Sequence, residues 1–295
     1  MRIKETRDRI QVLTFGQPAY PDLLQQIKDP PKTLYYIGKV ELLRSRCVAV
    51  VGSRTTTTYG RNIGRGIAIC LARHGVTVVS GMAAGIDTCA HEGALQERGP
   101  TIAVLGTGPD ICYPTENQAL KKAIEQHGLV ISEYEPGTRG MRHHFPQRNR
   151  IISGLSELTV IVQARNRSGA LITAELAAEQ GREVYAVPGN IDSQYNLGTN
   201  KLIREGVTPL ICVEDVLEPL NLKGWKQDGK AADFVRLSAR EKQVCELLQA
   251  HGELTADEVC LRLSLPANYV NPILTSLELK GFLYSASGKF FLANQ

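Results

Sequence analysis

Short runs of apolar, largely β-branched residues recur between residues 47 and 211, and they constrain the fold more than any other feature of the chain. Each run is apolar on both faces, as expected for strands buried between two layers. The runs are Cys47–Val51, Val76–Val79, Thr101–Leu105, Leu129–Ile131, Leu158–Val162, Val184–Val187 and Pro209–Ile211. Segments of helical period lie between them, notably Gly60–His74, Ile86–Arg98, Thr115–His127 and Ala170–Gln180. Because parallel strands need long crossover connections, this alternation predicts an α/β fold with an open, doubly wound, mostly parallel sheet.

The residues that follow the predicted strands indicate where a ligand would bind. Several strands end in small residues, at Gly52-Ser53-Arg54, Ser80-Gly81, Gly106-Thr107-Gly108 and Pro188-Gly189-Asn190. In a doubly wound sheet the ligand crevice lies outside the carboxyl ends of the strands. Small residues there let backbone N–H groups approach an anion closely. One such turn is typical of any tight connection, but several along one edge favour a binding site.

The sequence pattern divides the chain into a large unit and a small one. We expect a lead-in packed on the core, a sheet domain, a linker without periodicity and a C-terminal domain, at residues 1–40, 41–218, 219–235 and 236–295. In the last of these, Ser238-x-x-Glu241 and Thr255-x-x-Glu258 are capping boxes that open short helices. A third helical pattern and a hairpin signal around residues 285–289 follow. Three helices and a hairpin predict a small winged-helix domain.

The net charge is small, but the basic residues are unevenly distributed. The chain has 34 Lys plus Arg against 30 Asp plus Glu, a formal charge of +4. Residues 42–86 hold six arginines and no acid, and residues 139–167 hold six more arginines against Glu157 alone. The segment between them, residues 87–138, holds three basic and eight acidic residues. Arginine blocks in an acidic background are typical of a phosphate-binding face, although arginines scattered over a solvated surface would give the same count.

Several kinds of site are not expected. The loop after Val51 lacks both the Gly-x-Gly-x-x-Gly fingerprint and a Walker motif, so we expect no nucleotide cofactor. His91 and the pair His143-His144 have no Cys or carboxylate at ligand spacing, which argues against a metal. The chain has no apolar run long enough to span a membrane and no apolar signal core after Met1. Seven cysteines without a Cys-x-x-Cys pair indicate a reducing compartment, and we expect a cytoplasmic location.

The segment Phe145-Pro146-Gln147-Arg148-Asn149-Arg150 carries the clearest functional pattern. It places an aromatic ring among Arg142, Arg148 and Arg150, just before a predicted buried strand. Arginines neutralise successive phosphates while an aromatic ring stacks on an unpaired base, which is the combination that single-stranded nucleic acid requires. Taken alone, Phe145 is explained at least as well as a core residue that anchors the turn.

A longer series of motifs occurs in order between about residues 15 and 215. Its members are Gly52-Ser53-Arg54, Ser80–Asp87 with Ala90-His91, Tyr113-Pro114, Ser132-Glu133, Phe145–Ser156, Ser168–Ala174, Val187-Pro188-Gly189 and Gly198–Gly206. Together they resemble the DNA processing protein A family, also called Smf. The resemblance implies an extended Rossmann-like domain that binds single-stranded DNA and helps to load a RecA-type recombinase during natural transformation. It also implies a homodimer through that domain, no cofactor and no catalysis.

The resemblance also implies a set of DNA-binding residues. They are Gly52, Ser53, Arg54, Arg142, Phe145, Arg148, Asn149, Arg150, Ser168 and Gly169. The first three belong to the Gly-Ser-Arg motif, Phe145 begins a Phe-x-x-Arg-Asn-Arg segment, and Ser168 begins a glycine-rich turn expected to face the backbone phosphates. Two positions depart from the family pattern. Ala84 stands where some members carry an arginine, and Gln163 stands where many carry a glutamate.

Two other classes of function remain open from the sequence. Asp87, Glu133 and Glu135 are candidates for the acid and base of an enzyme that cleaves N-glycosidic bonds of nucleoside monophosphates. Against this, the chain has Ser168–Glu175 where such enzymes are expected to carry a Pro-Gly-Gly-x-Gly-Thr-x-x-Glu loop. A pure scaffold protein is the third class, and it would show no salt-sensitive binding to oligonucleotides.

The winged-helix domain is not expected to drive DNA affinity. Residues 236–295 hold six basic and six acidic residues, and the would-be recognition helix at residues 267–274 has no positive charge. A helix that enters the major groove normally brings Arg or Lys. Pro272 would also disturb this helix unless it lay in the first turn. We therefore expect the domain to contact protein.

Overall fold

The structure is a computed structural model that describes residues 9–222, 237–279, 282–286 and 288–292. Its internal contacts divide the chain into two units, Met1–Lys223 and Gly224–Gln295. The predicted linker, residues 219–235, lies mostly outside the described residues. None of the helices that can be described is long and apolar enough to cross a membrane.

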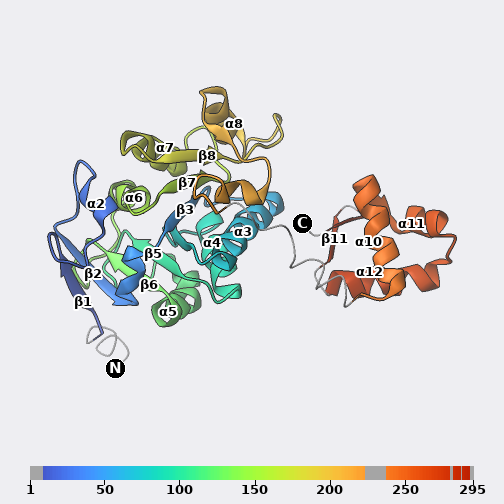
Figure 1. The fold of residues 1–295 in the computed structure, drawn as a ribbon, viewed down its shortest axis with the longest axis horizontal. Coiled ribbons are helices and arrows are strands. Elements are labelled where there is room, and N and C mark those ends of the chain that lie inside the picture. The colour runs from blue at the N-terminus through green and yellow to red at the C-terminus, as the bar shows by residue number, and fades with distance from the viewer. Residues whose placement is uncertain (1–8, 223–236, 280–281, 287, 293–295) are drawn as a thin grey trace. The chain divides into compact units, whose positions relative to one another are not determined.

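A nine-stranded sheet forms the centre of the first unit, in the order β1-β2-β6-β5-β4-β3-β7-β8-β9 (Figure 1). The strands are β1 (Gln11–Thr14), β2 (Thr33–Gly38), β3 (Cys47–Val51), β4 (Thr77–Ser80), β5 (Thr101–Leu105), β6 (Leu129–Ser132), β7 (Leu158–Ile161), β8 (Glu183–Ala186) and β9 (Thr208–Pro209). Every neighbouring pair from β6 to β9 is parallel. The predicted doubly wound, mostly parallel fold is confirmed. The strand order reverses at the β3–β7 pair, because β4, β5 and β6 lie on one side of β3 and β7 lies on the other.

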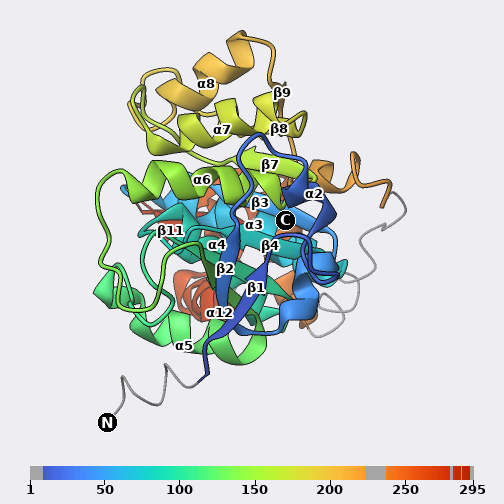
Figure 2. The same cartoon turned by 90° about the vertical axis from the view of Figure 1, so that its left-hand side faces the viewer.

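The N-terminal segment differs from the expected lead-in packed on the sheet. Residues 11–14 and 33–38 join the sheet as β1 and β2, antiparallel to each other, and β2 is antiparallel to β6 (Figure 2). Between them lies the short helix α2 (Asp22–Gln25), and the 3-10 helix η1 (Val40–Arg44) leads into β3. Leu34 and Ile37 of β2 are almost fully buried, which explains why the segment continues the sheet rather than lying over it.

Helices cover both faces of the sheet. The pair α3 (Thr58–Arg73) and α4 (Ile86–Gln96) packs on one face, with α5 (Gln118–His127) beside α4, and the pair α6 (His144–Gly154) and α7 (Gly169–Glu179) packs on the other (Figure 1). In β3, Val48 and Val50 belong to the core with α3 and α4, whereas Ala49 and Val51 belong to the core with α6 and α7. Burial on both faces explains the apolar runs of the sequence. The remaining elements are η2 (Thr115–Asn117), α8 (Leu197–Arg204) and η3 (Val213–Leu217).

The second unit has the three helices and the hairpin that the sequence predicts. They are α10 (Ala239–His251), α11 (Ala256–Leu263), α12 (Ala267–Leu279), and a sheet of β10 (Glu253–Thr255), β12 (Lys289–Leu292) and β11 (Leu283–Ala286). Both capping boxes form: the Ser238 hydroxyl accepts a hydrogen bond from the Glu241 N–H at 3.3 Å, and the Thr255 hydroxyl accepts one from the Glu258 N–H at 3.2 Å. Pro272 lies inside α12 rather than in its first turn, and the helix continues through it.

Candidate functional site

A cavity of about 390 Å³ opens at the carboxyl ends of β3 and β7. This is the place where the strand order reverses, so the crevices of the two halves of the sheet meet there. The turn after β3, the start of α6 and the turn from β7 into α7 supply its wall. Nine of the ten residues predicted to bind DNA line it, namely Gly52, Ser53, Arg54, Arg142, Phe145, Arg148, Asn149, Ser168 and Gly169.

The helix α6 carries much of this wall, and the local sequence pattern does not predict it. Pro146 and the three basic or polar residues that follow it, Gln147, Arg148 and Asn149, are more typical of a loop than of a helix. Pro146 is only the third residue of α6, where its missing N–H costs no helical hydrogen bond. Buried Ile151 and Ile152, with Leu155 just after the helix, pack into the core with α7, and Arg148 takes the same buried face. The signal for this helix in the sequence is an apolar stripe that an arginine interrupts.

Phe145 sits in a narrow slot beside the cavity. A Cβ atom added to Gly106 or to Gly140 would lie 3.0 Å from the ring, so a side chain at either position would require the ring to shift by a few tenths of an ångström. The Tyr113 ring lies 5.1 Å from the Phe145 ring, between centroids, and the Arg54 guanidinium lies 5.2 Å from the Phe145 centroid. Phe145 is partly exposed, so the ring has both a fixed position and an accessible part.

Several arginines outside the cavity pair with carboxylates. Arg46, Arg65 and Arg73 pair with Glu157, Glu92 and Glu97. In the part of the chain that the structure describes, no carboxylate pairs with any of four cavity arginines, which are Arg54, Arg142, Arg165 and Arg167. Their positive charge is therefore available to an anionic ligand.

The burial and contacts of Arg148 differ from those expected of a phosphate ligand. Its side chain is buried, with 4% of the residue exposed, and its guanidinium donates hydrogen bonds to the Gly81 carbonyl at 2.6 Å and to the Val104 carbonyl. Burial lowers the pKa of Arg148 to about 10, and the nearby Asp87 carboxylate opposes that effect. Arg148 therefore ties α6 to the end of β4 and to β5 at the cavity wall, and its Nη1 atom is already bonded to two backbone carbonyls.

The carboxylates considered for an N-glycosidase do not converge. Only Asp87 lines the cavity, where it accepts hydrogen bonds from the N–H groups of Gly81 and Ala83 at 3.2 and 3.4 Å. Burial raises the pKa of Asp87, while Arg148 lowers it. Glu133 pairs with Arg150, and Glu135 accepts a hydrogen bond from the Tyr35 hydroxyl at 3.5 Å. The three carboxylates are therefore not arranged as the acid and base of one active site.

The histidines considered for a metal do not form a metal site. His91 is fully buried, and its Nδ1 lies 2.7 Å from the Thr101 hydroxyl. His144 is buried and stacks on Tyr134 with ring centroids 4.0 Å apart. Among the described residues, no three His, Cys, Asp or Glu side chains gather as metal ligands would.

Comparison with known proteins decides the family. The family model for DNA recombination-mediator protein A matches residues 11–221, and the model for the DprA winged helix domain matches residues 230–289. The chain belongs to the DNA recombination-mediator protein A family. The resemblance inferred from the motif series is thereby confirmed.

Relatives in this family are similar over most of the chain. The DNA processing protein DprA of Bacillus subtilis is 41% identical over 212 residues, which cover 72% of this chain and 71% of that protein. The X-ray structure of DNA processing protein A from Streptococcus pneumoniae is 41% identical, with a TM-score of 0.68 over 73% of this chain and 76% of that one. DNA processing protein A from Helicobacter pylori, solved for its single-stranded DNA binding mode, is 32% identical, with a TM-score of 0.65 over 72% of this chain and 96% of that one.

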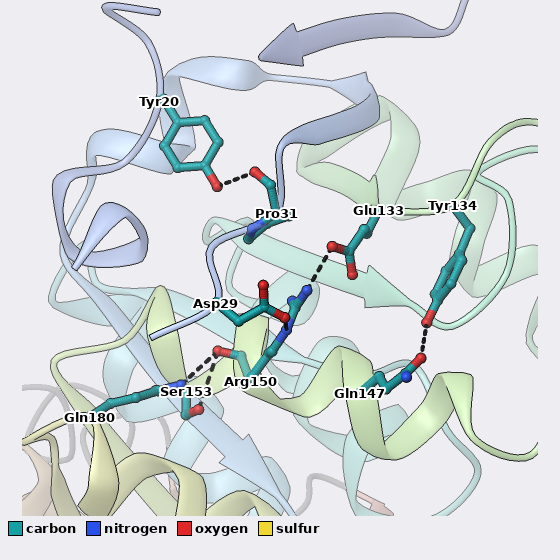
Figure 3. A network of polar contacts seen from close by, with 9 residues as sticks. All are labelled: Tyr20, Asp29, Pro31, Glu133, Tyr134, Gln147, Arg150, Ser153 and Gln180. Atoms are coloured by element: carbon teal, nitrogen blue, oxygen red, sulfur yellow. Dashed lines mark hydrogen bonds and ion pairs between the residues drawn. The ribbon is translucent and has the colours of Figure 1, made fainter. Parts of the chain in front are cut away.

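Arg150 is the one residue predicted to bind DNA that does not line the cavity. Its guanidinium pairs with Glu133 at 2.6 Å and with Asp29 at 3.3 Å (Figure 3). The backbone carbonyl of Arg150 also accepts a hydrogen bond from the Gln180 amide at 3.1 Å. Arg150 thus joins α6 to the segment between α2 and β2 and to the end of β6. This geometry supports a structural role for it rather than the predicted contact with DNA.

Proposed function

We propose that the first unit binds single-stranded DNA in the cavity at the β3–β7 strand ends. The observation that carries the proposal is a set of four arginines around one cavity, beside a partly exposed aromatic ring, that have no carboxylate partner among the described residues. The Helicobacter pylori relative, solved for its single-stranded DNA binding mode, supports the same ligand class.

In the proposed binding mode, Arg54 and Arg142 neutralise backbone phosphates while Phe145 stacks on an unpaired base. The Ser168-Gly169 turn brings the Gly169 N–H, at the start of α7, to the same cavity. Stacking of a base on an aromatic ring contributes about 1–3 kcal/mol. Duplex DNA binds less well in this mode, because its paired bases are not available to the ring.

For the whole protein, we propose the role that the family resemblance implies. The protein protects incoming single-stranded DNA and helps to load a RecA-type recombinase in natural transformation and recombination. It works in the cytoplasm as a homodimer through its Rossmann-like unit, without a cofactor and without catalysis. Membership of the DNA recombination-mediator protein A family supports this proposal.

Replacing Arg54 with alanine tests the binding mode. Arg54 is exposed at the cavity and has no carboxylate partner among the residues that can be described, so its loss should weaken binding to all single-stranded sequences alike. The slope of log affinity against log salt should become shallower by about 0.7, the value for one phosphate on a single strand. Fluorescence anisotropy titrations over a range of salt concentrations measure both quantities. Unchanged affinity and slope would show that the ligand lies elsewhere.

A further inference from the structure

The segment that follows β7 contributes two arginines to the cavity, Arg165 and Arg167. The neighbouring strands β3 and β7 are parallel, so this segment and the Gly52-Ser53-Arg54 turn lie at the same edge of the sheet. Arg165 is partly buried and Arg167 is exposed. Neither has a carboxylate partner among the described residues. The cavity therefore has positive charge on the β7 side as well as at Arg54.

A tyrosine outside the cavity holds one of these arginines. The Arg165 guanidinium lies over the Tyr195 ring, 4.6 Å from its centroid. Arg165 lines the cavity and Tyr195 does not, so the ring contacts the guanidinium away from the ligand space. A cation over an aromatic face is stabilised by the quadrupole of the ring, and the contact leaves the N–H groups at the edge of the guanidinium free to donate.

The loop that carries Tyr195 is itself fixed to the segment that carries Arg165. The Gln163 amide donates a hydrogen bond to the Asn196 side chain at 2.8 Å, and the Gly198 N–H donates one to the Ala164 carbonyl at 2.7 Å. A Cβ atom added to Gly198 would lie 2.7 Å from that same carbonyl, so only glycine allows this close approach. These contacts fix the loop of Tyr195 relative to the segment of Arg165, so the ring stays over the guanidinium.

We propose that Arg165 and Arg167 form a second phosphate subsite of the cavity, and that Tyr195 is the positioning residue that orients Arg165 for it. The inference rests on the proposed function, because its ligand is a backbone phosphate of the same single strand whose neighbouring phosphate Arg54 binds. A guanidinium matches a phosphate with two parallel hydrogen bonds, which favours this ligand over a base at the β7 side. The helix α7 begins at Gly169 in the same wall, so the positive end of its dipole also favours an anion at this side of the cavity.

Charge-removal variants of the full chain, titrated with a fluorescein-labelled oligothymidylate, test the subsite. Arg165→Gln and Arg167→Gln should each weaken binding by about tenfold, as expected for a charge-assisted hydrogen bond. Each should make the salt slope shallower by about 0.7. The matched control is Lys122→Gln, which removes one exposed positive charge from α5, an element that does not line the cavity. The control should leave affinity and slope near the wild-type values.

The role of Tyr195 requires a double-mutant cycle. Tyr195→Leu should weaken binding by about two- to fivefold, and Tyr195→Phe, which keeps the ring, should restore it. If Tyr195 acts through Arg165, the double variant Arg165→Gln/Tyr195→Leu should bind no more weakly than Arg165→Gln alone. A purely structural role for Tyr195 would add its loss to that of Arg165→Gln, and this result would overturn the positioning role.

The outcomes separate this inference from the function on which it rests. If the wild-type protein binds the oligonucleotide, Arg54→Ala weakens the binding, and both Gln variants match Lys122→Gln, then the second subsite is wrong and the proposed function stands. If the wild-type protein shows no salt-dependent binding, the proposed function itself fails. Circular dichroism melting of each variant identifies any loss of affinity that comes from unfolding.

Discussion

Three arginines of the predicted site show that one residue type takes three roles around one cavity. Arg54 is exposed and has no carboxylate partner in the described chain, so it is available to a ligand. Arg148 is buried, and its hydrogen bonds go to backbone carbonyls. Arg150 pairs with Glu133 and Asp29. The sequence motif places all three close together but does not show which of them keeps its charge for DNA, because their partners are distant in the chain.

Removing Arg150 should therefore cost stability and leave the salt dependence of DNA binding unchanged. Arg150→Ala leaves Glu133 without its partner, which costs about 1–3 kcal/mol. Each 1 kcal/mol lowers the melting temperature of a domain of this size by about 2–4 °C. Thermal melting and anisotropy titrations across salt concentrations measure the two effects. A slope shallower by about 0.7 would mean that Arg150 contacts a phosphate after all.

At the scale of elements, the sequence predicts the strands from β3 to β8 but not β1, β2 or the site helix α6. The apolar sequence runs that form β3 to β8 are recognisable because burial on both faces makes them continuously apolar. Of the last run, Pro209–Ile211, only Pro209 lies in a strand, the two-residue β9, while Leu210 is buried and Ile211 is exposed. The helix α6 was missed because Pro146 and the arginines mask its apolar stripe. Its placement depends on the Arg148 contacts with β4 and β5, which no local pattern reveals.

The contact between α4 and β5 should make stability sensitive to acid. Thr101 donates its hydroxyl proton to the Val78 carbonyl, so His91 must donate from Nδ1 to the Thr101 oxygen. Burial lowers the pKa of His91 from 6.5 to about 3. As the pH falls from about 6.5 toward 3, His91 takes up a proton in the unfolded chain but stays neutral in the folded chain. The free energy of unfolding should thus fall by up to about 1.4 kcal/mol per pH unit.

The variant His91→Asn isolates this effect, because the Asn side chain keeps a donor for Thr101 and does not titrate. Urea unfolding at two pH values within that window should show a smaller acid loss for the variant than for the wild type. Equal losses in both proteins would mean that His91 is not the group responsible.

At the scale of the whole molecule, the arginines are concentrated on the cavity of the first unit rather than on the winged helix. The helix α12 contains no Lys or Arg, and Pro272 lies within it. The first unit has hydrophobic cores of its own that include no residue of the second. Deleting residues 236–295 should therefore leave affinity for single-stranded DNA nearly intact. A drop of more than tenfold in an anisotropy titration would assign part of the DNA site to the winged helix.

The central claim is that a cavity at the β3–β7 strand ends binds unpaired DNA through phosphates and a stacked base. The most direct test compares mobility shifts of single- and double-stranded oligonucleotides of one sequence at two salt concentrations. We predict tighter binding of the single strand at both concentrations, with affinity falling as salt rises. Equal binding of the duplex, or binding that does not respond to salt, would contradict the claim.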